Sequence, residues 1–256
     1  MKWRYFLICT CLLFFALPNF AQTPPSDMKL FLLIGQSNMA GRGIVEPQDE
    51  ATSPHIFMLK KDLQWTLAKD PVHFDKPVAG VGLASEFART LAQADFDMSI
   101  GLIPCAVGGT SLDQWKAGGE LYTNAILRTK EALKNGQLAG ILWHQGEADN
   151  NPEKTKTYVE RFQTMIAQLR KDLDAENVPV IIGELGHFKA NANSFNVMLP
   201  SIPANVPLCA LVTAEDLTDK GDKLHFDAKS LRVFGQRYAE AFLSFESKEK
   251  TATKTP

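Results

Sequence analysis

Five short and nearly continuous apolar runs recur along this chain, at residues 29–34, 99–105, 138–143, 178–183 and 207–213. They lack the alternation of a strand with one wet face, so they are typical of strands buried on both sides. Between them, residues 83–94, 122–134, 152–173 and 228–245 place apolar side chains at helical spacing. The alternation predicts an α/β fold, a flavodoxin-like three-layer α/β/α sandwich with a five-stranded parallel sheet.

Two segments depart from this alternation. Residues 44–80 contain a pattern typical of a small hairpin, at 55–59 and 64–67, which we interpret as an insertion on the substrate side. After Phe245 the chain is rich in Glu, Lys, Thr and Ser without apolar periodicity, which predicts a disordered tail over residues 246–256. Asp227 is a plausible N-cap of the last helix. We therefore expect one domain over residues 22–245.

The N-terminus has the pattern of a secretory signal peptide. Lys2 and Arg4 precede an apolar run over residues 6–17, and Pro18 and Ala21 then mark a break and a cleavage position. The run is shorter than the roughly 20 residues needed to span a bilayer, although a retained signal anchor is the alternative. The prediction is a signal peptide over residues 1–21 and a periplasmic or secreted protein.

The charge balance and the cysteine content indicate which partners and which disulfides to expect. Without residues 1–21 the chain has 25 Lys and Arg against 29 Asp and Glu, a formal charge near −4. Such a balance gives no basic field for nucleic acid. Cys105 and Cys209 each lie in a predicted core strand; a disulfide between them is possible, but two buried free thiols are the favoured interpretation.

Ser37 is the first candidate for chemistry. It stands directly after the first predicted strand, where the N–H groups of a following turn or helix would favour developing negative charge. Its sequence context lacks the Gly-x-Ser-x-Gly pattern, because Met39 occupies the last position, and the serine is not in the middle of the chain. Both features disfavour an α/β-hydrolase fold. Alone, a serine here would more often be a simple cap.

Asp222 and His225 form the second candidate. A carboxylate three residues before an imidazole, in a loop entering a helix, can hold one tautomer and leave the other ring nitrogen to accept a serine proton. The motif is weak alone, and Asp216, Asp219 and Asp227 are nearby substitutes for the acid.

Two further polar segments follow the second and third predicted strands. Residues 108–111 read Gly-Gly-Thr-Ser, and residues 144–147 read His-Gln-Gly-Glu. Glycines let backbone N–H groups approach a ligand closely, and Gln145 can offer a side-chain donor to an oxyanion. His144 and Glu147 could instead be metal ligands, but the other histidines show no supporting spacing, so no metal is expected. Each segment alone could be an ordinary turn.

Taken together, four ordered blocks resemble a known family. Residues 31–43, 104–111, 143–147 and 222–225 are similar to the conserved segments of the sialate O-acetylesterase and acetylxylan esterase group. This group is carbohydrate esterase family 6 of the SGNH (GDSL-like) hydrolase superfamily. The resemblance covers nearly all of the chain after residue 21, and it implies a serine esterase without metal or organic cofactor.

The resemblance also implies roles for individual residues. Ser37 would be the nucleophile, His225 the base and Asp222 the residue that orients it. The oxyanion hole would comprise the N–H groups of Ser37 and Gly109 and the side chain of Gln145. Supporting or substrate-binding roles fall to a wider group, namely Gln36, Asn38, Arg42, Thr110, Glu147 and His187.

The expected substrate is an acetylated carbohydrate, and three possibilities remain open. Acetylated xylan or a related plant oligosaccharide is the first expectation, because a compact single domain resembles the acetylxylan esterases. An O-acetylated sialic acid is the second, and its carboxylate would want a cation such as Arg42 near the pocket. Trp115 could line the sugar site or pack in the core. The third possibility, from another class, is a carbohydrate-binding protein without turnover. A general lipase is disfavoured, because no apolar lid is visible and the insertion is charged.

Overall fold

The computed structural model describes residues 24–252, and the predicted signal peptide over residues 1–21 lies outside them. Seven strands form one sheet in the order β3-β2-β4-β1-β5-β6-β7. The strands are β1 Met28–Gly35, β2 Ile56–Leu59, β3 Trp65–Leu67, β4 Ile100–Pro104, β5 Gly136–His144, β6 Val180–Gly183 and β7 Cys209–Val212. All neighbouring pairs are parallel except β2 with β3.

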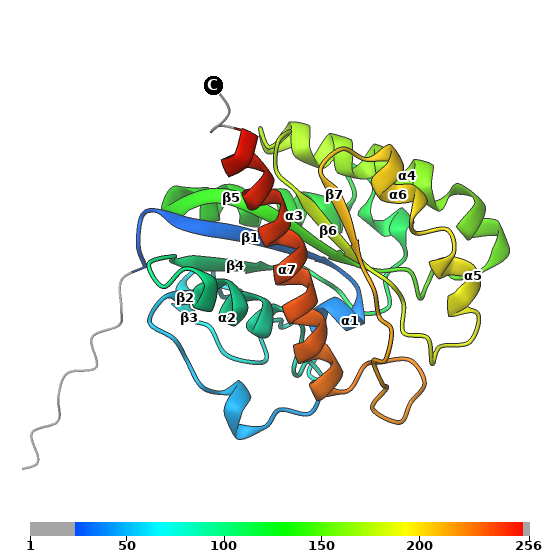
Figure 1. The fold of residues 1–256 in the computed structure, drawn as a ribbon, viewed down its shortest axis with the longest axis horizontal. Coiled ribbons are helices and arrows are strands. Elements are labelled where there is room, and N and C mark those ends of the chain that lie inside the picture. The colour runs from blue at the N-terminus through cyan, green and yellow to red at the C-terminus, as the bar shows by residue number, and fades with distance from the viewer. Residues whose placement is uncertain (1–23, 253–256) are drawn as a thin grey trace, which may run out of the picture.

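Helices cover both faces of this sheet, as Figure 1 shows. The α-helices are α1 Ser37–Ala40, α2 Ala84–Ala94, α3 Glu120–Ala132, α4 Pro152–Asp172, α5 Ala192–Asn196, α6 Ser201–Asn205 and α7 Ala228–Ala252. Three short 3-10 helices are η1 Pro47–Asp49, η2 Leu112–Trp115 and η3 Leu133–Asn135. Helices α2 and α7 lie on the near face, while α3 and α4 lie behind the sheet. The predicted three-layer α/β/α sandwich is confirmed.

Strand β1 shows why the chain forms two cores. Its side chains alternate between faces, so Leu30 and Leu32 pack in the cluster under α3 and α4, whereas Phe31 packs in the cluster under α2 and α7. Phe31 makes edge-to-face contacts with Phe87 of α2 and Phe242 of α7, at centroid distances of 4.8 and 5.0 Å. A central strand buried on both sides therefore needs the continuous apolar run that its sequence carries.

Two predictions of extent were wrong. The sheet has seven strands and not five, because the hairpin at residues 55–67 joins its edge: β2 pairs in parallel with β4 and β3 returns beside it. The pattern of these residues predicted the hairpin but not its pairing with β4. The tail predicted to be disordered from residue 246 instead continues α7 to Ala252, and Glu246 contacts Lys29 at the start of β1.

Cys105 and Cys209, the cysteines within the described residues, are free, as favoured from the sequence. Cys105 follows β4, whereas Cys209 begins β7, and the sheet order places four interstrand steps between these strands. At roughly 4.8 Å a step, the separation is about 19 Å. That is far beyond the Cα distance of roughly 4.4–6.8 Å that a disulfide requires. Burial raises the pKa of the Cys105 thiol to about 12, so this cysteine is an unreactive core residue.

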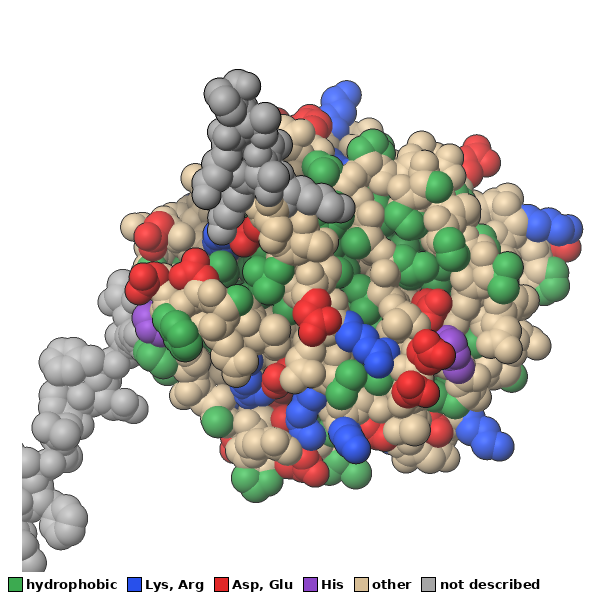
Figure 2. All heavy atoms as spheres, in the orientation of Figure 1, with side chains coloured by type: hydrophobic (Ala, Val, Ile, Leu, Met, Phe, Trp, Pro, Cys, Tyr) green, Lys and Arg blue, Asp and Glu red, His purple; other side chains and the backbone are tan. Residues whose placement is uncertain are grey.

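Two further features of the described part are the hydropathy of its helices and the distribution of charged side chains on its surface. None of the helices in residues 24–252 combines the length and hydropathy that crossing a bilayer demands. Figure 2 shows acidic and basic side chains interspersed on the face that it draws.

Asp70 gives the fold a pH-dependent stability. This carboxyl is 3% exposed, its Oδ1 accepts a hydrogen bond from Gly82 N at 3.3 Å, and its Oδ2 has no partner among the described residues. Burial raises the pKa of Asp70 to about 6. The folded state therefore binds more protons than the unfolded state between about pH 4 and 6, so stability falls as the pH rises through that window.

We expect Asp70→Asn to stabilise the protein by about 1–3 kcal/mol at pH 7.5 and to have little effect at pH 4.5, because it removes the cost of a buried charge. Urea denaturation at both pH values measures this difference. Asp97→Asn, which alters an exposed carboxyl, is the matched control. An equal effect of Asp70→Asn at the two pH values would contradict the assignment.

Candidate active site

The carboxyl ends of three neighbouring strands meet at one cavity of about 380 Å³. Ser37 follows β1, Gly108 and Gly109 follow β4, Glu147 follows β5, and His225 comes from the loop before α7. This is where ligands of parallel α/β sheets gather. The complete lining is Gln36, Ser37, Arg42, Lys76, Val78, Gly108, Gly109, Glu147, Ala148, Leu224 and His225.

Ser37, His225 and Asp222 form a continuous hydrogen-bond chain. His225 Nε2 lies 3.0 Å from Ser37 Oγ, and His225 Nδ1 lies 2.8 Å from Asp222 Oδ2. Because the Asp222 carboxylate can only accept, Nδ1 carries the proton and Nε2 is free to accept from the serine hydroxyl. The serine can therefore lose its proton to the imidazole as its oxygen attacks an electrophile.

Asp222 is held in its ionised form. Its Oδ1 also accepts the backbone N–H groups of Leu224 at 3.0 Å and His225 at 2.8 Å. Partial burial acts to raise the pKa of Asp222, but the hydrogen bonds from His225 and Leu224 outweigh it and hold that pKa well below its usual range. The carboxylate therefore stays charged at neutral and mildly acidic pH.

Two other acids of this loop, Asp219 and Asp227, accept hydrogen bonds from backbone N–H groups. Asp219 accepts from the N–H of Gly221 and of Lys223, and Asp227 accepts from Ser230 N at 2.7 Å as the predicted N-cap of α7. Asp216 has a left-handed backbone and no hydrogen bond of its side chain to the described residues. Among the four aspartates weighed from the sequence, only Asp222 bonds to His225.

Asn38 joins the histidine loop to the strand ends. Its Nδ2 donates to Leu224 O at 3.1 Å and contacts the Glu147 carboxylate, while its Oδ1 accepts from Phe226 N at 3.2 Å. Leu224 and Phe226 flank His225 in the sequence, so these bonds hold the backbone of His225 in place beside Ser37. The structure thus places Asn38 and the Glu147 carboxylate beside the histidine loop, and a supporting role for both stays a prediction.

Glycines after β4 bring the backbone against the nucleophile. A Cβ at Gly108 would lie 2.4 Å from the Arg42 guanidinium and 3.4 Å from Ser37 Cβ, so only glycine fits there. Gly109 has φ +84°, a left-handed conformation that glycine adopts without cost. The N–H groups of Ser37 and Gly109 have no acceptor among the described residues, and both residues line the cavity.

Gln145 does not face the cavity, contrary to the expectation for an oxyanion donor. It is 1% exposed, and its Nε2 lies near three acceptors: Asp149 Oδ2 at 2.7 Å, Thr110 O at 3.1 Å and Gln36 Oε1 at 3.2 Å. Tyr158 donates to its Oε1 at 2.8 Å. Both N–H bonds of the amide are therefore directed to protein acceptors behind the cavity wall.

Arg42 lines the cavity but does not offer a free charge. Its guanidinium donates to Asp75 at 2.6 and 3.3 Å, and the two side chains are 4% and 1% exposed. Asp75 also accepts Gly108 N at 2.8 Å. Burial acts to raise the pKa of Asp75, but Arg42 and the N–H of Gly108 outweigh it and hold that pKa below its usual range. Asp75 was missed from the sequence, where nothing distinguishes it within the insertion.

Three other candidates lie away from the cavity. His187 bonds to Glu184 at 3.1 Å in an exposed loop. Trp115 is 1% exposed and packs edge to face on Trp143, so it belongs to the core and not to the sugar site. Thr110 is buried, and its hydroxyl donates to Val107 O and accepts from Trp115 Nε1. Neither His187 nor Trp115 is among the residues that line the cavity at Ser37.

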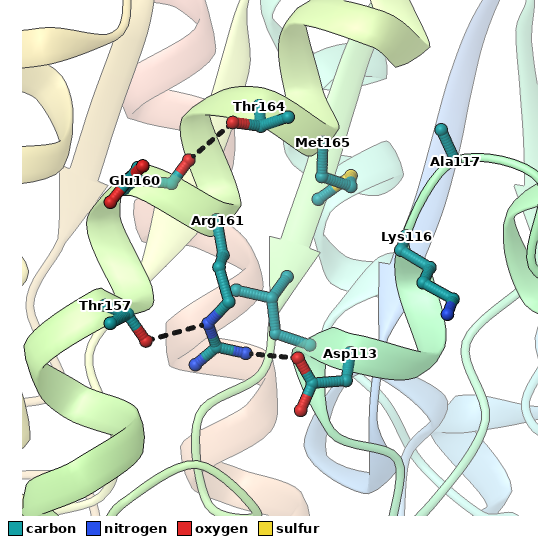
Figure 3. A pocket seen from close by; sticks show the side chains of 9 residues that line it. Asp113, Lys116, Ala117, Thr157, Glu160, Arg161, Thr164 and Met165 are labelled. Atoms are coloured by element: carbon teal, nitrogen blue, oxygen red, sulfur yellow. Dashed lines mark hydrogen bonds and ion pairs between the residues drawn. The ribbon is translucent and has the colours of Figure 1, made fainter.

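A second cavity of about 390 Å³ lies between η2 and α4. Figure 3 shows Arg161 extending across it from α4 toward Thr157 and Asp113. Its lining contains no nucleophile beside a base, so it offers no catalytic arrangement. His144 and Glu147, considered as metal ligands, lie 3.9 Å apart, and the described residues contain no group of three or more His, Cys, Asp or Glu placed to hold a metal.

Comparison with known proteins shows the family to which this chain belongs. Residues 27–244 match the family model of sialic acid-specific acetylesterases, which are carbohydrate esterases. A probable carbohydrate esterase from Arabidopsis thaliana is 32% identical over 244 residues, which cover 87% of this chain and 93% of that protein. The chain belongs to the sialic acid-specific acetylesterase family of carbohydrate esterases, as the sequence blocks had indicated. It is accordingly a carboxylic ester hydrolase, a carbohydrate acetylesterase.

Solved structures agree on the fold. An Arabidopsis thaliana protein superimposes with a TM-score of 0.80 at 30% identity, covering 86% of this chain and 99% of that one. NanS has a TM-score of 0.72 at 19% identity, covering 88% of this chain and 99% of its own. Axe2, an acetylxylan esterase from Geobacillus stearothermophilus, has a TM-score of 0.51 at 13% identity, covering 87% and 95%. The last two, at less than 25% identity, show a shared fold.

Proposed function

We propose that this protein removes O-acetyl groups from carbohydrates through an acetyl-enzyme on Ser37. The observation that carries the proposal is the chain of hydrogen bonds from Ser37 through His225 to Asp222, at 3.0 and 2.8 Å, which opens onto a cavity. Ser37 Oγ attacks the acetyl carbonyl while His225 accepts its proton, and Asp222 stabilises the imidazolium. The sugar oxygen leaves with that proton, and water then hydrolyses the acetyl-enzyme by the same route.

The test is acetate release by the purified protein from an aryl acetate, acetylated xylan and an O-acetylated sialic acid. An organophosphonate that labels serine nucleophiles provides a second readout. Release from any of the three substrates together with labelling at Ser37 would support the proposal. A carbohydrate-binding protein without turnover would release no acetate and take no label.

Among acetylated sugars, we favour one that carries a carboxylate, such as a sialic acid, over acetylated xylan. Lys76 lines the cavity, its side chain is exposed, and within the described residues no carboxylate lies at ion-pair distance from its ammonium group. Arg42, by contrast, is neutralised by Asp75. The name of the family model supports the same class of substrate. Acetylated xylan, the first expectation from the sequence, is the comparison substrate.

We expect Lys76→Ala to lower kcat/KM for an O-acetylated sialic acid by about 3–10-fold, mostly through KM, because an exposed charged contact contributes modestly. The aryl acetate, which has no carboxylate, should be hydrolysed at an unchanged rate. Steady-state kinetics at low and high salt measure the effect, which should shrink as salt screens it. Lys116→Ala, at the second cavity, is the control. Equal losses on both substrates would contradict recognition of the carboxylate by Lys76.

Export completes the proposal. The pattern of residues 1–21 supports cleavage after Ala21 and a periplasmic or secreted enzyme. N-terminal sequencing of the protein recovered from its own host's extracellular and periplasmic fractions tests this.

A further inference from the structure

Gln36 presents an unused amide donor beside the nucleophile. It precedes Ser37, lines the cavity and is 3% exposed. Its Oε1 accepts hydrogen bonds from Gln145 Nε2 at 3.2 Å and from Ala148 N at 3.3 Å. Because oxygen and nitrogen lie on opposite sides of a planar amide, two donors on the oxygen also fix the position of Nε2. No acceptor among the described residues pairs with that nitrogen.

Gln145 lies behind Gln36 and is itself held from behind. Its Nε2 has two hydrogens and three acceptors, and the shortest distance, 2.7 Å, is to the fully buried Asp149 carboxylate. Asp149 in turn accepts from Leu112 N at 2.8 Å and from Arg161 at 3.3 Å. Arg161 belongs to α4 and lines the second cavity, where Figure 3 shows its guanidinium beside Asp113 and Thr157. The hydrogen bonds thus lead from Arg161 through Asp149 and Gln145 to the side-chain oxygen of Gln36, and the Gln145 amide does not reach the cavity.

We propose that Gln36 Nε2 is the side-chain donor of the oxyanion hole and that Gln145 is a positioning residue acting through it. The proposal rests on the acetyl-enzyme function proposed above. As the bond from Ser37 Oγ to the carbonyl carbon forms, the carbonyl electron pair moves to oxygen and the serine proton moves to His225 Nε2. The oxygen then accepts N–H bonds from Ser37, Gly109 and Gln36. When the carbonyl re-forms, the bond to the sugar oxygen breaks and that oxygen takes the proton from His225.

A double-mutant cycle with Gln36→Ala and Gln145→Ala tests the division of roles. Loss of one oxyanion donor lowers turnover by roughly 10²–10³-fold, so we expect Gln36→Ala to lose that much in kcat on an aryl acetate with little change in KM. If Gln145 acts only through Gln36, the double variant should be no slower than Gln36→Ala alone. Phosphonate titration of Ser37 normalises every rate to intact sites, and Gln114→Ala, outside the cavity, is the control.

A second variant keeps the test valid if Gln36→Ala is unstable. Gln36→Glu preserves the shape and the oxygen acceptor but loses the N–H donor unless its carboxyl is protonated. Its activity relative to wild type should therefore increase as the pH is lowered, which a merely structural role would not produce. A kcat for Gln36→Ala within threefold of wild type, or losses that multiply in the double variant, would overturn the proposal alone. Absence of any Ser37-dependent turnover in wild type would overturn the proposed function as well.

Discussion

Replacing Ser37 with alanine should abolish acetate release, with kcat/KM falling by at least about 10⁴-fold, because the proposed acetyl-enzyme forms on the Ser37 hydroxyl. The fold should survive. The Ser37 hydroxyl bonds only to His225 among the described residues, and it is 5% exposed, so its loss leaves neither an unpaired core group nor a large cavity. Acetate release from the aryl acetate, normalised to protein that unfolds at the wild-type Tm, measures the effect.

Ser85→Ala is the matched control for this variant. Ser85 is also 5% exposed and lies in α2, away from the cavity at Ser37. It should retain full activity and take one equivalent of phosphonate, whereas Ser37→Ala should take none. Substantial turnover by Ser37→Ala, or labelling of another serine in that variant, would contradict the acetyl-enzyme.

The sheet was predictable because its strands are buried on both faces. Continuous apolar runs mark β1, β4, β5, β6 and β7 wherever a strand has helices above and below it. The hairpin at the sheet edge was recognised as strands but not as part of the sheet, because register against β4 depends on contacts between distant segments. Its membership follows from packing, which the local pattern of residues 55–67 does not contain.

The candidate site was predictable in its positions and less so in its orientations. Polar residues after adjacent parallel strands must meet at one edge, so Ser37 and Gly109 could be assigned to one cavity from the order of the motifs, whereas His225 was assigned from the Asp-x-x-His motif. Gln145 follows β5, and its side-chain direction depends on hydrogen bonds with Asp149 and Tyr158. Tyr158 belongs to α4, so these bonds form only once α4 has packed on the sheet. Its hydrogen-bond partners, and hence its role, could not be read from its own motif.

The charge state of the cavity was also not predictable from the sequence around Arg42. Its sequence position beside the nucleophile suggested a free cation for an acidic sugar. Asp75, 33 residues later in the insertion, forms a buried ion pair with it and also holds Gly108. Whether a charged side chain beside a site is free to bind a ligand depends on its counter-ion. Of the two cations that line this cavity, Arg42 has a counter-ion among the described residues and Lys76 has none.

Asp222→Asn should lower kcat/KM by about 10³–10⁴-fold at neutral pH without unfolding the protein. The amide would present an N–H group to His225 Nδ1, which forces the ring proton onto Nε2. That nitrogen could then no longer accept from Ser37, now 3.0 Å away. Rates on the aryl acetate measure the loss. Asp216→Asn is the matched control, because asparagine tolerates the left-handed backbone at that position and Asp216 does not bond to His225.

The pH profile separates this role from a structural one. The hydrogen bonds that hold the pKa of Asp222 below its usual range keep the carboxylate ionised throughout the assay range, so its own protonation never limits activity there. The ionised carboxylate stabilises the protonated, inactive imidazole, and its removal favours the neutral form. In Asp222→Asn the acidic limb of kcat/KM should therefore shift to lower pH while the plateau falls. A lower plateau with an unmoved limb would mean that Asp222 holds the loop but does not act on His225 electrostatically.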